Sequence, residues 1–337
     1  MKKILLSGVK STGRPHLGNY FGVMKQYVDL QQEYDTRIFI ADLHALTTVR
    51  DAETLSQSTI DLAIDYLAIG VDPKDVLIFK QSDLPQVTEL AWIFNCITSV
   101  PYLMRAHAFK DAEAKSKDIN VGLFDYPILM AADILIHNAD IVPVGHDQRQ
   151  HLEMARDIAE KFNREFCGVH ADSSEEEKEK AIFKLPEPMI LEEVEIIPGI
   201  DGQKMSKSYN NHIPLFSTDE ELKSLVMGIV TDSGSADDIA SGKITGIPEH
   251  VYNIHKLVRD KNSLDAFYEE NKGKYKILKD ELLKDLIAFI TPLRVRREKI
   301  AEDTDEIKRM LSSNGEKVRE LTSELVTKVR MVTGLEF

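Results

Sequence analysis

Short apolar stretches alternate with longer segments of helical periodicity through the first half of this 337-residue chain. The apolar stretches have the length of buried strands and show no helical stripe; they cover 3–9, 38–41, 76–80 and 141–144. The segments between them repeat apolar residues every three to four positions, which predicts helices over 20–33, 52–69, 86–98, 127–137 and 148–163. Strands that alternate with helices favour a doubly wound parallel sheet, so the sequence predicts a Rossmann-like α/β fold.

The alternation stops near residue 211, and the remaining pattern is helical only. The sequence predicts helices over 218–230, 250–260, 262–290 and 292–332. A charge run at 172–180 is typical of a solvated loop or helix start. We therefore expect a Rossmann-like catalytic domain over 1–197, a mobile loop over 198–211, and an all-α domain over 212–337.

Composition limits the classes of protein to consider. Hydrophobic residues make up 43% of the chain, which is ordinary for a soluble protein. No apolar run reaches a membrane span and the start lacks a signal peptide, so we expect a cytoplasmic protein without a membrane partner. Cys96 and Cys167 are too few for a four-ligand metal centre and predict two buried, reduced thiols. The net charge of −14 argues against indiscriminate polyanion binding.

The stretch SGVKSTGRPHLGNYFG, residues 7–22, follows the first strand and predicts a phosphate cradle. Pro15 suits the first turn of a helix, whose free N–H groups and dipole would face an anion. Gly18 allows a ligand to approach the backbone closely, and His16 and Asn19 add side-chain donors. Such ligands bind at the carboxyl ends of parallel strands. The alternative is an ordinary turn with a packed histidine.

A second motif, Lys204-Met205-Ser206-Lys207-Ser208, lies in the glycine-flanked loop. Two lysines separated by two residues can close on a polyphosphate as mobile point charges. The alternative is a solvated basic loop.

Together, P-H-L-G-N and K-M-S-K-S resemble the paired signatures of class I aminoacyl-tRNA synthetases. Residues 130–163, MAADILIHNADIVPVGHDQRQHLEMARDIAEKFN, are similar to the specificity block of the tryptophanyl-tRNA synthetase family, and TDS at 231–233 fits that family. The sister tyrosyl-tRNA synthetases share the fold and both signatures but lack the MAAD–PVGxDQ combination. The resemblance covers nearly the whole chain.

The resemblance implies a role for individual residues. For catalysis it implies His16, Asn19, Lys204 and Lys207. For ATP it implies Lys10, Ser11, Thr12, Gly18, Asn19, Gly145, His146, Asp147, Ile196, Lys204, Met205, Ser206, Lys207 and Ser208. For tryptophan it implies Asp133, Met130, His44, Tyr126 and Gln148.

Physical chemistry supports the role of Asp133, because an indole nitrogen only donates and a carboxylate accepts. The alternative for Asp133 is a helix cap or a salt-bridged core aspartate. For His44 and Tyr126 the alternative is local packing.

The resemblance also implies the reaction and its partners. L-tryptophan and ATP, with Mg²⁺, would give tryptophanyl-adenylate, which is transferred to tRNA(Trp) by a homodimeric enzyme. The basic cluster of Arg294, Arg296, Arg297 and Lys299 is either a tRNA phosphate footprint or a solvated helix face.

One segment departs from the family pattern. Residues 105–112 carry Ala108 and Ala112 where many members have polar side chains, which leaves contacts from these two positions in doubt.

Two other functions remain as alternatives. The first is another α/β nucleotidylyltransferase, whose serine-rich second signature is absent. The second is a non-catalytic RNA-binding relative, which would be expected to have lost the lysines or the histidine.

Overall fold

A five-stranded parallel sheet forms the centre of the computed structural model, which describes residues 2–11, 13–106, 109–110, 119–145, 148–190, 197–231 and 246–336. The strands are β1 (Ile4–Val9), β2 (Asp35–Ile40), β3 (Val76–Lys80), β4 (Ile141–Val144) and β5 (Glu187–Ile190). Their order in the sheet is β3-β2-β1-β4-β5, and every pairing is parallel. This is the doubly wound order, with its switch point between β1 and β4. The predicted fold class is confirmed.

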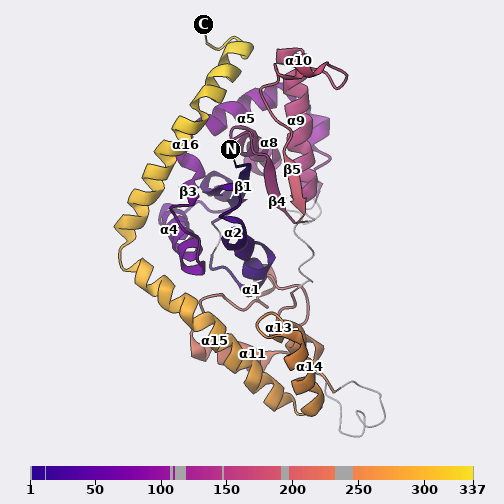
Figure 1. The fold of residues 1–337 in the computed structure, drawn as a ribbon, viewed down its shortest axis with the longest axis vertical. Helices are drawn as coiled ribbons and strands as arrows, with labels where there is room; N and C mark the ends of the chain where they lie inside the picture. Colours follow the sequence, from indigo (N-terminus) through magenta and orange to yellow (C-terminus); the bar gives the residue numbers. More distant parts are fainter. Residues whose placement is uncertain are drawn as a thin grey trace.

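Helices cover both faces of the sheet (Figure 1). In the first half of the chain they are α1 (Leu17–Asn19), the π-helix η1 (Tyr20–Met24), α2 (Lys25–Leu30), α3 (Asp42–Ala45), α4 (Ala52–Ile69), the 3₁₀ turn η2 (Gln81–Asp83), α5 (Gln86–Ile97), α6 (Val100–Leu103), α8 (Val121–Leu135), α9 (Arg149–Cys167) and α10 (Glu175–Lys178). In the second half they are the 3₁₀ turn η4 (Lys207–Tyr209), α11 (Asp219–Gly228), α13 (Glu249–His255), α14 (Lys261–Glu270), α15 (Tyr275–Ala301) and α16 (Thr304–Thr333).

Side chains of β2 alternate between two hydrophobic cores. Ile38 and Ile40 belong to the core that α4 shares with the helices of the second half. Phe39 points to the opposite core, which contains residues of α5, α8 and α9. A parallel strand that is buried on both faces reads as a continuous apolar run, which is why the sequence pattern identified it.

One strand was missed, and several predicted helix boundaries differ from the structure. Strand β5 was missed because it begins with Glu187 and Pro188, which leaves only two apolar residues in a four-residue edge strand. Pro292 lies inside α15, and the long helices divide at residues 302–303 instead. The expected helix over 262–290 is interrupted between α14 and α15. These are packing outcomes that local periodicity does not encode.

In the basic cluster of α15 the three arginines bind within the protein, while Arg296 and Lys299 are exposed to solvent. Arg297 donates to Asp65 at 2.6 Å and to Asp61 at 3.2 Å, both on α4. Arg296 donates to the carbonyl of Ala68 at 3.2 Å. Arg294 donates to Asp219 at 2.8 Å and to a nearby backbone carbonyl. The three arginines therefore join α15 to α4 and to the start of α11.

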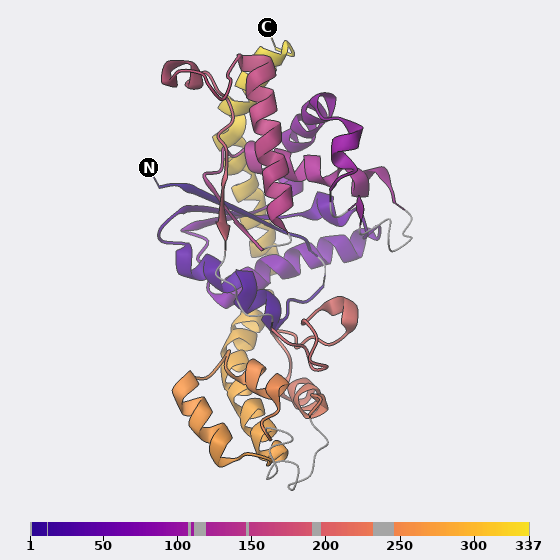
Figure 2. The ribbon, with the colours of Figure 1, turned by 90° about the vertical axis from the view of Figure 1, so that its right-hand side faces the viewer.

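Helix α16 returns from the helical part to the sheet (Figures 1 and 2). Asn314 donates to the carbonyl of Ile78 in β3 at 2.9 Å. Arg330 binds Glu89 of α5 through two bonds of 2.7 and 2.6 Å. The last helix of the chain thus packs beside the edge of the sheet.

Both cysteines are free thiols, but Cys96 is exposed and Cys167 is only half-buried, so the prediction of two buried thiols was wrong. Among the described residues, none of the helices combines the length and apolar character that crossing a membrane requires.

Candidate functional site

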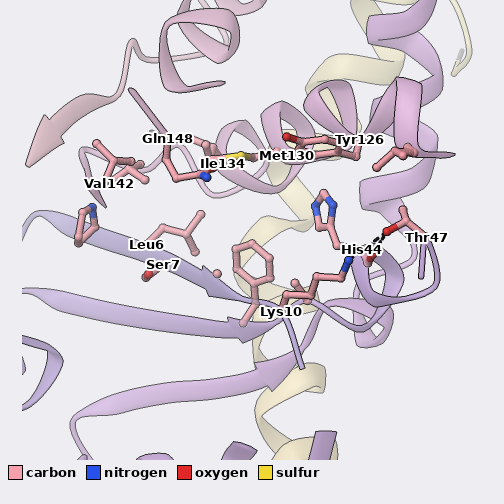
Figure 3. A pocket seen from close by; sticks show the side chains of 16 residues that line it. Leu6, Ser7, Lys10, His44, Thr47, Tyr126, Met130, Ile134, Val142 and Gln148 are labelled. Carbon is pink, nitrogen blue, oxygen red and sulfur yellow. Dashed lines mark hydrogen bonds between the residues drawn. The ribbon is translucent and has the colours of Figure 1, made fainter. Parts of the chain in front are cut away.

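A cavity of about 550 Å³ lies at the switch point of the sheet. Ligand sites of this fold occur at the carboxyl ends of the strands where the order reverses, here β1 and β4. Figure 3 shows the lining side chains, which are Leu6, Ser7, Gly8, Lys10, Phe39, Ala41, His44, Thr47, Leu123, Tyr126, Met130, Ile134, Val142, Pro143, Val144 and Gln148. The structure therefore brings together Lys10 and four of the residues predicted for the amino acid.

Helix α8 supplies one wall of the cavity. Leu123, Tyr126, Met130 and Ile134 all line it, and their spacing of three or four residues places them on one helical face. The wall is mostly apolar, as a pocket for a large side chain requires.

Tyr126 begins a chain of polar groups along this wall. Its hydroxyl lies 2.8 Å from Nε2 of His151, and Nδ1 of His151 lies 3.1 Å from Oε1 of Gln148. A neutral His151 that donates from Nδ1 to the amide oxygen accepts the tyrosine proton at Nε2. The hydroxyl oxygen and the amide oxygen are both acceptors, which suits a cationic ligand group.

Asp133 does not line the cavity. It is 2% exposed, and burial raises its pKa, opposed by hydrogen bonds from His44 and Gln81. Nε2 of Gln81 lies 2.8 Å from both carboxylate oxygens, and Nε2 of His44 lies 3.0 Å from Oδ2. His44 stands in the cavity wall with its ring edge-on to Tyr126 at 6.0 Å. Asp133 thus lies directly behind His44.

The predicted cradle is built around a capping box. His16 is the N-cap of α1, and its Nδ1 accepts the N–H of Asn19 at 3.3 Å, while Oδ1 of Asn19 accepts the N–H of His16 at 3.1 Å. Because Nδ1 is an acceptor, the proton of the neutral ring resides on Nε2, which is a donor. Burial, followed by the charge of Lys207 and by His212, lowers the pKa of His16 to about 4. His16 is therefore neutral at pH 7.

The expected free N–H groups at the helix start include one that is already bound within the protein. The N–H of Leu17 donates to the carbonyl of Ile213 at 3.0 Å, and the N–H of Leu215 donates to Pro15 at 2.9 Å. His16 and Pro214 form an antiparallel bridge between them. The turn after β1 is thus paired through its backbone with the segment that follows K-M-S-K-S.

The K-M-S-K-S loop lies against the cradle. Nζ of Lys207 donates to the carbonyl of Gly13 at 2.9 Å, and burial lowers its pKa. Met205 is 4% exposed, and its Cβ would be 3.6 Å from a Cβ added at Gly18. Lys204 and Ser208 are exposed beside it. The two distant motifs predicted to share a triphosphate are adjacent in space.

Asn211 holds this loop in shape. It is 1% exposed. Its Oδ1 accepts the N–H of Ser206 at 2.8 Å, and its Nδ2 donates to Asp201 at 2.7 Å and to the carbonyl of Lys204 at 3.1 Å.

Several predicted residues need separate mention. Ser11 is buried, and its Oγ has no hydrogen-bond partner within the described part of the chain. Gly145 directly follows β4 and is half-buried. Outside the described residues lie Thr12, His146, Asp147 and Ile196, together with Ala108 and Ala112.

Sequence reasoning missed four residues of this site. They are Gln81, His151, Asn211 and His212, whose ring centroid lies 5.7 Å from that of His16. One signal was available: Gln81 directly follows an apolar strand, and ligands of this fold bind at the carboxyl ends of the strands.

Comparisons with known proteins agree with the geometry. The family model "tRNA synthetases class I (W and Y)" matches residues 2–291. The tryptophan–tRNA ligase of Fusobacterium nucleatum is 45% identical, with 98% of this chain and 97% of the relative covered, and that of Rhodopirellula baltica is 39% identical, with 98% and 99% covered. The crystal structure of tryptophanyl-tRNA synthetase from Campylobacter jejuni, complexed with ADP and tryptophan, superposes with a TM-score of 0.87 at 37% identity, covering 98% of this chain and 99% of that one.

Proposed function

This chain belongs to the class I tRNA synthetases for tryptophan and tyrosine, and from that premise we propose that it is a tryptophan–tRNA ligase. It activates L-tryptophan with ATP to tryptophanyl-adenylate and pyrophosphate, and then transfers the aminoacyl group to tRNA(Trp). One observation carries the proposal: an amino-acid-sized cavity lies at the switch point of the sheet, and the turn that follows the same strand β1 is paired with the K-M-S-K-S loop.

The cavity takes the tryptophan. Met130 packs against the indole ring, and the ring N–H reaches past the lining side chains to the buried carboxylate of Asp133, which directly precedes Ile134 of the wall. Oδ1 of Asp133 accepts one hydrogen bond, from Gln81, and a carboxylate oxygen has capacity for a second. Tyr126 and Gln148 accept hydrogen bonds from the ammonium group. His44 lines the same wall and orients Asp133.

The cradle and the loop take the ATP. Ser11, Gly18 and Asn19 meet the phosphates and ribose, Met205, Ser206 and Ser208 shape the loop side, and Gly145 borders the nucleotide at the end of β4. We extend the assignment to Thr12, His146, Asp147 and Ile196 by family resemblance alone. Lys10 lines the cavity from the end of β1, with Nζ 3.1 Å from Oγ1 of Thr47. That position suits a contact where the amino acid and the α-phosphate meet.

The chemical step needs no enzyme nucleophile. The carboxylate of tryptophan attacks the α-phosphate in line, and the enzyme contributes alignment and charge stabilisation. His16 donates from Nε2 to a phosphoryl oxygen, and Asn19 donates from its side-chain amide. Lys204 and Lys207 stabilise the negative charge that moves onto the pyrophosphate, as the loop closes.

Mg²⁺ accompanies ATP, bound by phosphate oxygens, and neutralises part of their charge. Across the described ranges, three or more His, Cys, Asp or Glu side chains do not converge in a metal-binding arrangement. An ion carried by the nucleotide fits that composition.

The helical part, from α11 to α15, contacts the tRNA anticodon, through a surface other than the three arginines already bound within the protein. The enzyme acts as a homodimer in the cytoplasm, where tRNA is charged. Sedimentation of the purified protein measures the oligomeric state directly.

Amino-acid-dependent exchange of labelled pyrophosphate into ATP tests the proposal. We expect exchange with tryptophan and at most a trace with tyrosine. Exchange driven by tyrosine would assign the chain to the sister specificity, and no exchange with any amino acid would remove the ligase function altogether.

A further inference from the structure

Gln81 lies at the centre of the polar cluster behind the cavity. It is 1% exposed and begins η2, directly after the edge strand β3. Its side chain contacts two other elements, α3 and α8, and both carry residues of the proposed tryptophan site. The carboxylate of Asp133 joins the same three elements, because it binds both Gln81 and His44.

The orientation of the Gln81 amide is fixed by its surroundings. Its Oε1 accepts the backbone N–H of Leu43 at 3.1 Å and that of His44 at 3.3 Å. A reversed amide would set N–H groups against N–H groups, so Nε2 must face α8. There it lies 2.8 Å from Oδ1 and 2.8 Å from Oδ2 of Asp133.

Gln81 therefore binds two groups at once: the backbone N–H of His44 and the carboxylate of Asp133. The side chain of His44 binds the same carboxylate. Asp133, His44 and Gln81 form a closed ring of hydrogen bonds, because His44 donates to Oδ2 of Asp133 at 3.0 Å. Asp42 packs at the outer side of this ring, where it accepts the N–H of Ser82 at 3.0 Å. A carboxylate held from two sides has a single orientation.

We propose that Gln81 is a positioning residue for indole recognition, which fixes Asp133 and His44 so that the site selects a ring that donates a hydrogen bond. The inference rests on the proposed function, because Asp133 must be the acceptor of the ring N–H. Burial favours the neutral form of Asp133, and two permanent donors favour the accepting carboxylate. A protonated carboxyl group can also donate a hydrogen bond, so it would no longer favour a ring that donates one.

The test compares two substrates that differ at one ring atom. Tryptophan has a ring N–H, and β-(benzothiophen-3-yl)alanine has sulfur in its place. The variant Gln81→Glu keeps the shape and the acceptor for Leu43 and His44 but replaces the donor with a second carboxyl group. We expect kcat/KM in pyrophosphate exchange to fall at least about tenfold for tryptophan and by less than about threefold for the sulfur analogue, as lost charged hydrogen bonds predict.

Gln31→Glu is the matched control. Gln31 is also buried and also bridges backbone groups, with Nε2 3.0 Å from the carbonyl of Val28 and Oε1 2.8 Å from the N–H of Asp72, but these partners are not residues of the proposed tryptophan site. The variant Gln31→Glu should leave the ratio of kcat/KM for tryptophan to kcat/KM for the sulfur analogue unchanged. The apolar variant Gln81→Met serves as a second probe and should shift the ratio in the same direction.

Three outcomes overturn the inference: an equal fall with both substrates, an unchanged ratio in both Gln81 variants, or a failure of both variants to fold. A different result tests the underlying assignment. If the wild-type enzyme does not prefer tryptophan over the sulfur analogue, or if Asp133→Leu, which has no acceptor, retains the preference, Asp133 is not the acceptor and the proposed tryptophan contact fails instead.

Discussion

The two halves of the site are constructed differently. The tryptophan side consists of side chains from a strand end and from helices, linked by buried hydrogen bonds such as those from Gln81 and His44 to Asp133. The phosphate side consists of two loops, joined by backbone pairing at His16 and Pro214 and by the contact of Lys207 with Gly13. The first half is held by buried hydrogen bonds between side chains, whereas the second depends on how two distant segments approach each other.

This difference suggests a division of labour. Selectivity requires a fixed geometry, because a displaced acceptor no longer rejects the wrong ring. Phosphate chemistry requires charge that follows the leaving group, which a mobile lysine supplies. Substitutions on the two sides should therefore change different kinetic constants.

The largest effect is expected for Lys204→Ala. Loss of a cation that acts on the pyrophosphate should slow tryptophan-dependent exchange by about 10²–10³-fold, while tryptophan binding, measured by equilibrium dialysis, changes little. Lys223→Ala, at an exposed position on α11, is the control. Equal losses in binding and in rate would contradict the separation of the two halves.

A smaller effect is expected for Gly18→Ala. The added Cβ would lie 2.9 Å from Nδ1 of His16 and 3.6 Å from Cβ of Met205, so the cradle must shift relative to the loop. We expect kcat/KM for ATP to fall on the order of tenfold to a hundredfold. Gly22→Ala is the matched control, because nothing lies within 4 Å of its Cβ. Wild-type kinetics in both variants would show that the spacing of cradle and loop is uncritical.

Tyr126→Phe should act on the other half. It removes the hydroxyl that contacts His151 and, in our proposal, the substrate ammonium. One lost hydrogen bond of about 1 kcal/mol should raise the KM for tryptophan about fivefold and leave the KM for ATP unchanged. Tyr102→Phe, whose hydroxyl contacts Asp157 away from the cavity, is the comparison. A rise in both KM values would mean that the halves are coupled through Tyr126.

The smallest effect concerns pH. Because the pKa of His16 is lowered to about 4, the free enzyme holds it neutral at every pH above about 5. The kcat/KM for ATP should show no inflection from His16 between pH 5 and 8, and His16→Asn should lower the profile without changing its shape. A wild-type inflection near 6.5 that the variant lacks would contradict a neutral donor.

The same shift has a consequence for stability. In the unfolded chain His16 binds a proton below about pH 6.5. In the folded chain it binds the proton only below about pH 4. The contribution of His16 to the free energy of unfolding is therefore present above about 6.5 and is lost as the pH falls from there towards 4. Acid unfolding of His16→Asn should show less pH dependence over that interval.

The two halves also differ in what the sequence could predict. On the phosphate side, H-x-G-N and K-M-S-K-S are local patterns with a mechanism, and their proximity was predicted correctly. The pairing of Pro15 and Leu17 with 213–215 could not be read locally, because it joins segments about two hundred residues apart. That pairing also uses the N–H of Leu17, which the sequence had suggested for an anion.

On the tryptophan side, family resemblance predicted the residues but not the contacts between them. Gln81 and His151 act through partners on other elements, so neither stands out in its own segment. Alternation predicted the doubly wound parallel sheet but not the order of its strands, and it missed β5, in which only Met189 and Ile190 are apolar. Periodicity identifies elements, and only packing determines which polar groups meet.

Helix α16 is far from strand β3 in the sequence but packs against it in the fold. Strand β3 forms one margin of the sheet, and Asn314 covers the carbonyl of Ile78 at that margin. An uncovered margin of this kind recruits strands from other molecules and promotes aggregation. A chain shortened at residue 303 would lose this cover, and its main defect would be self-association of the catalytic sheet rather than weaker RNA binding.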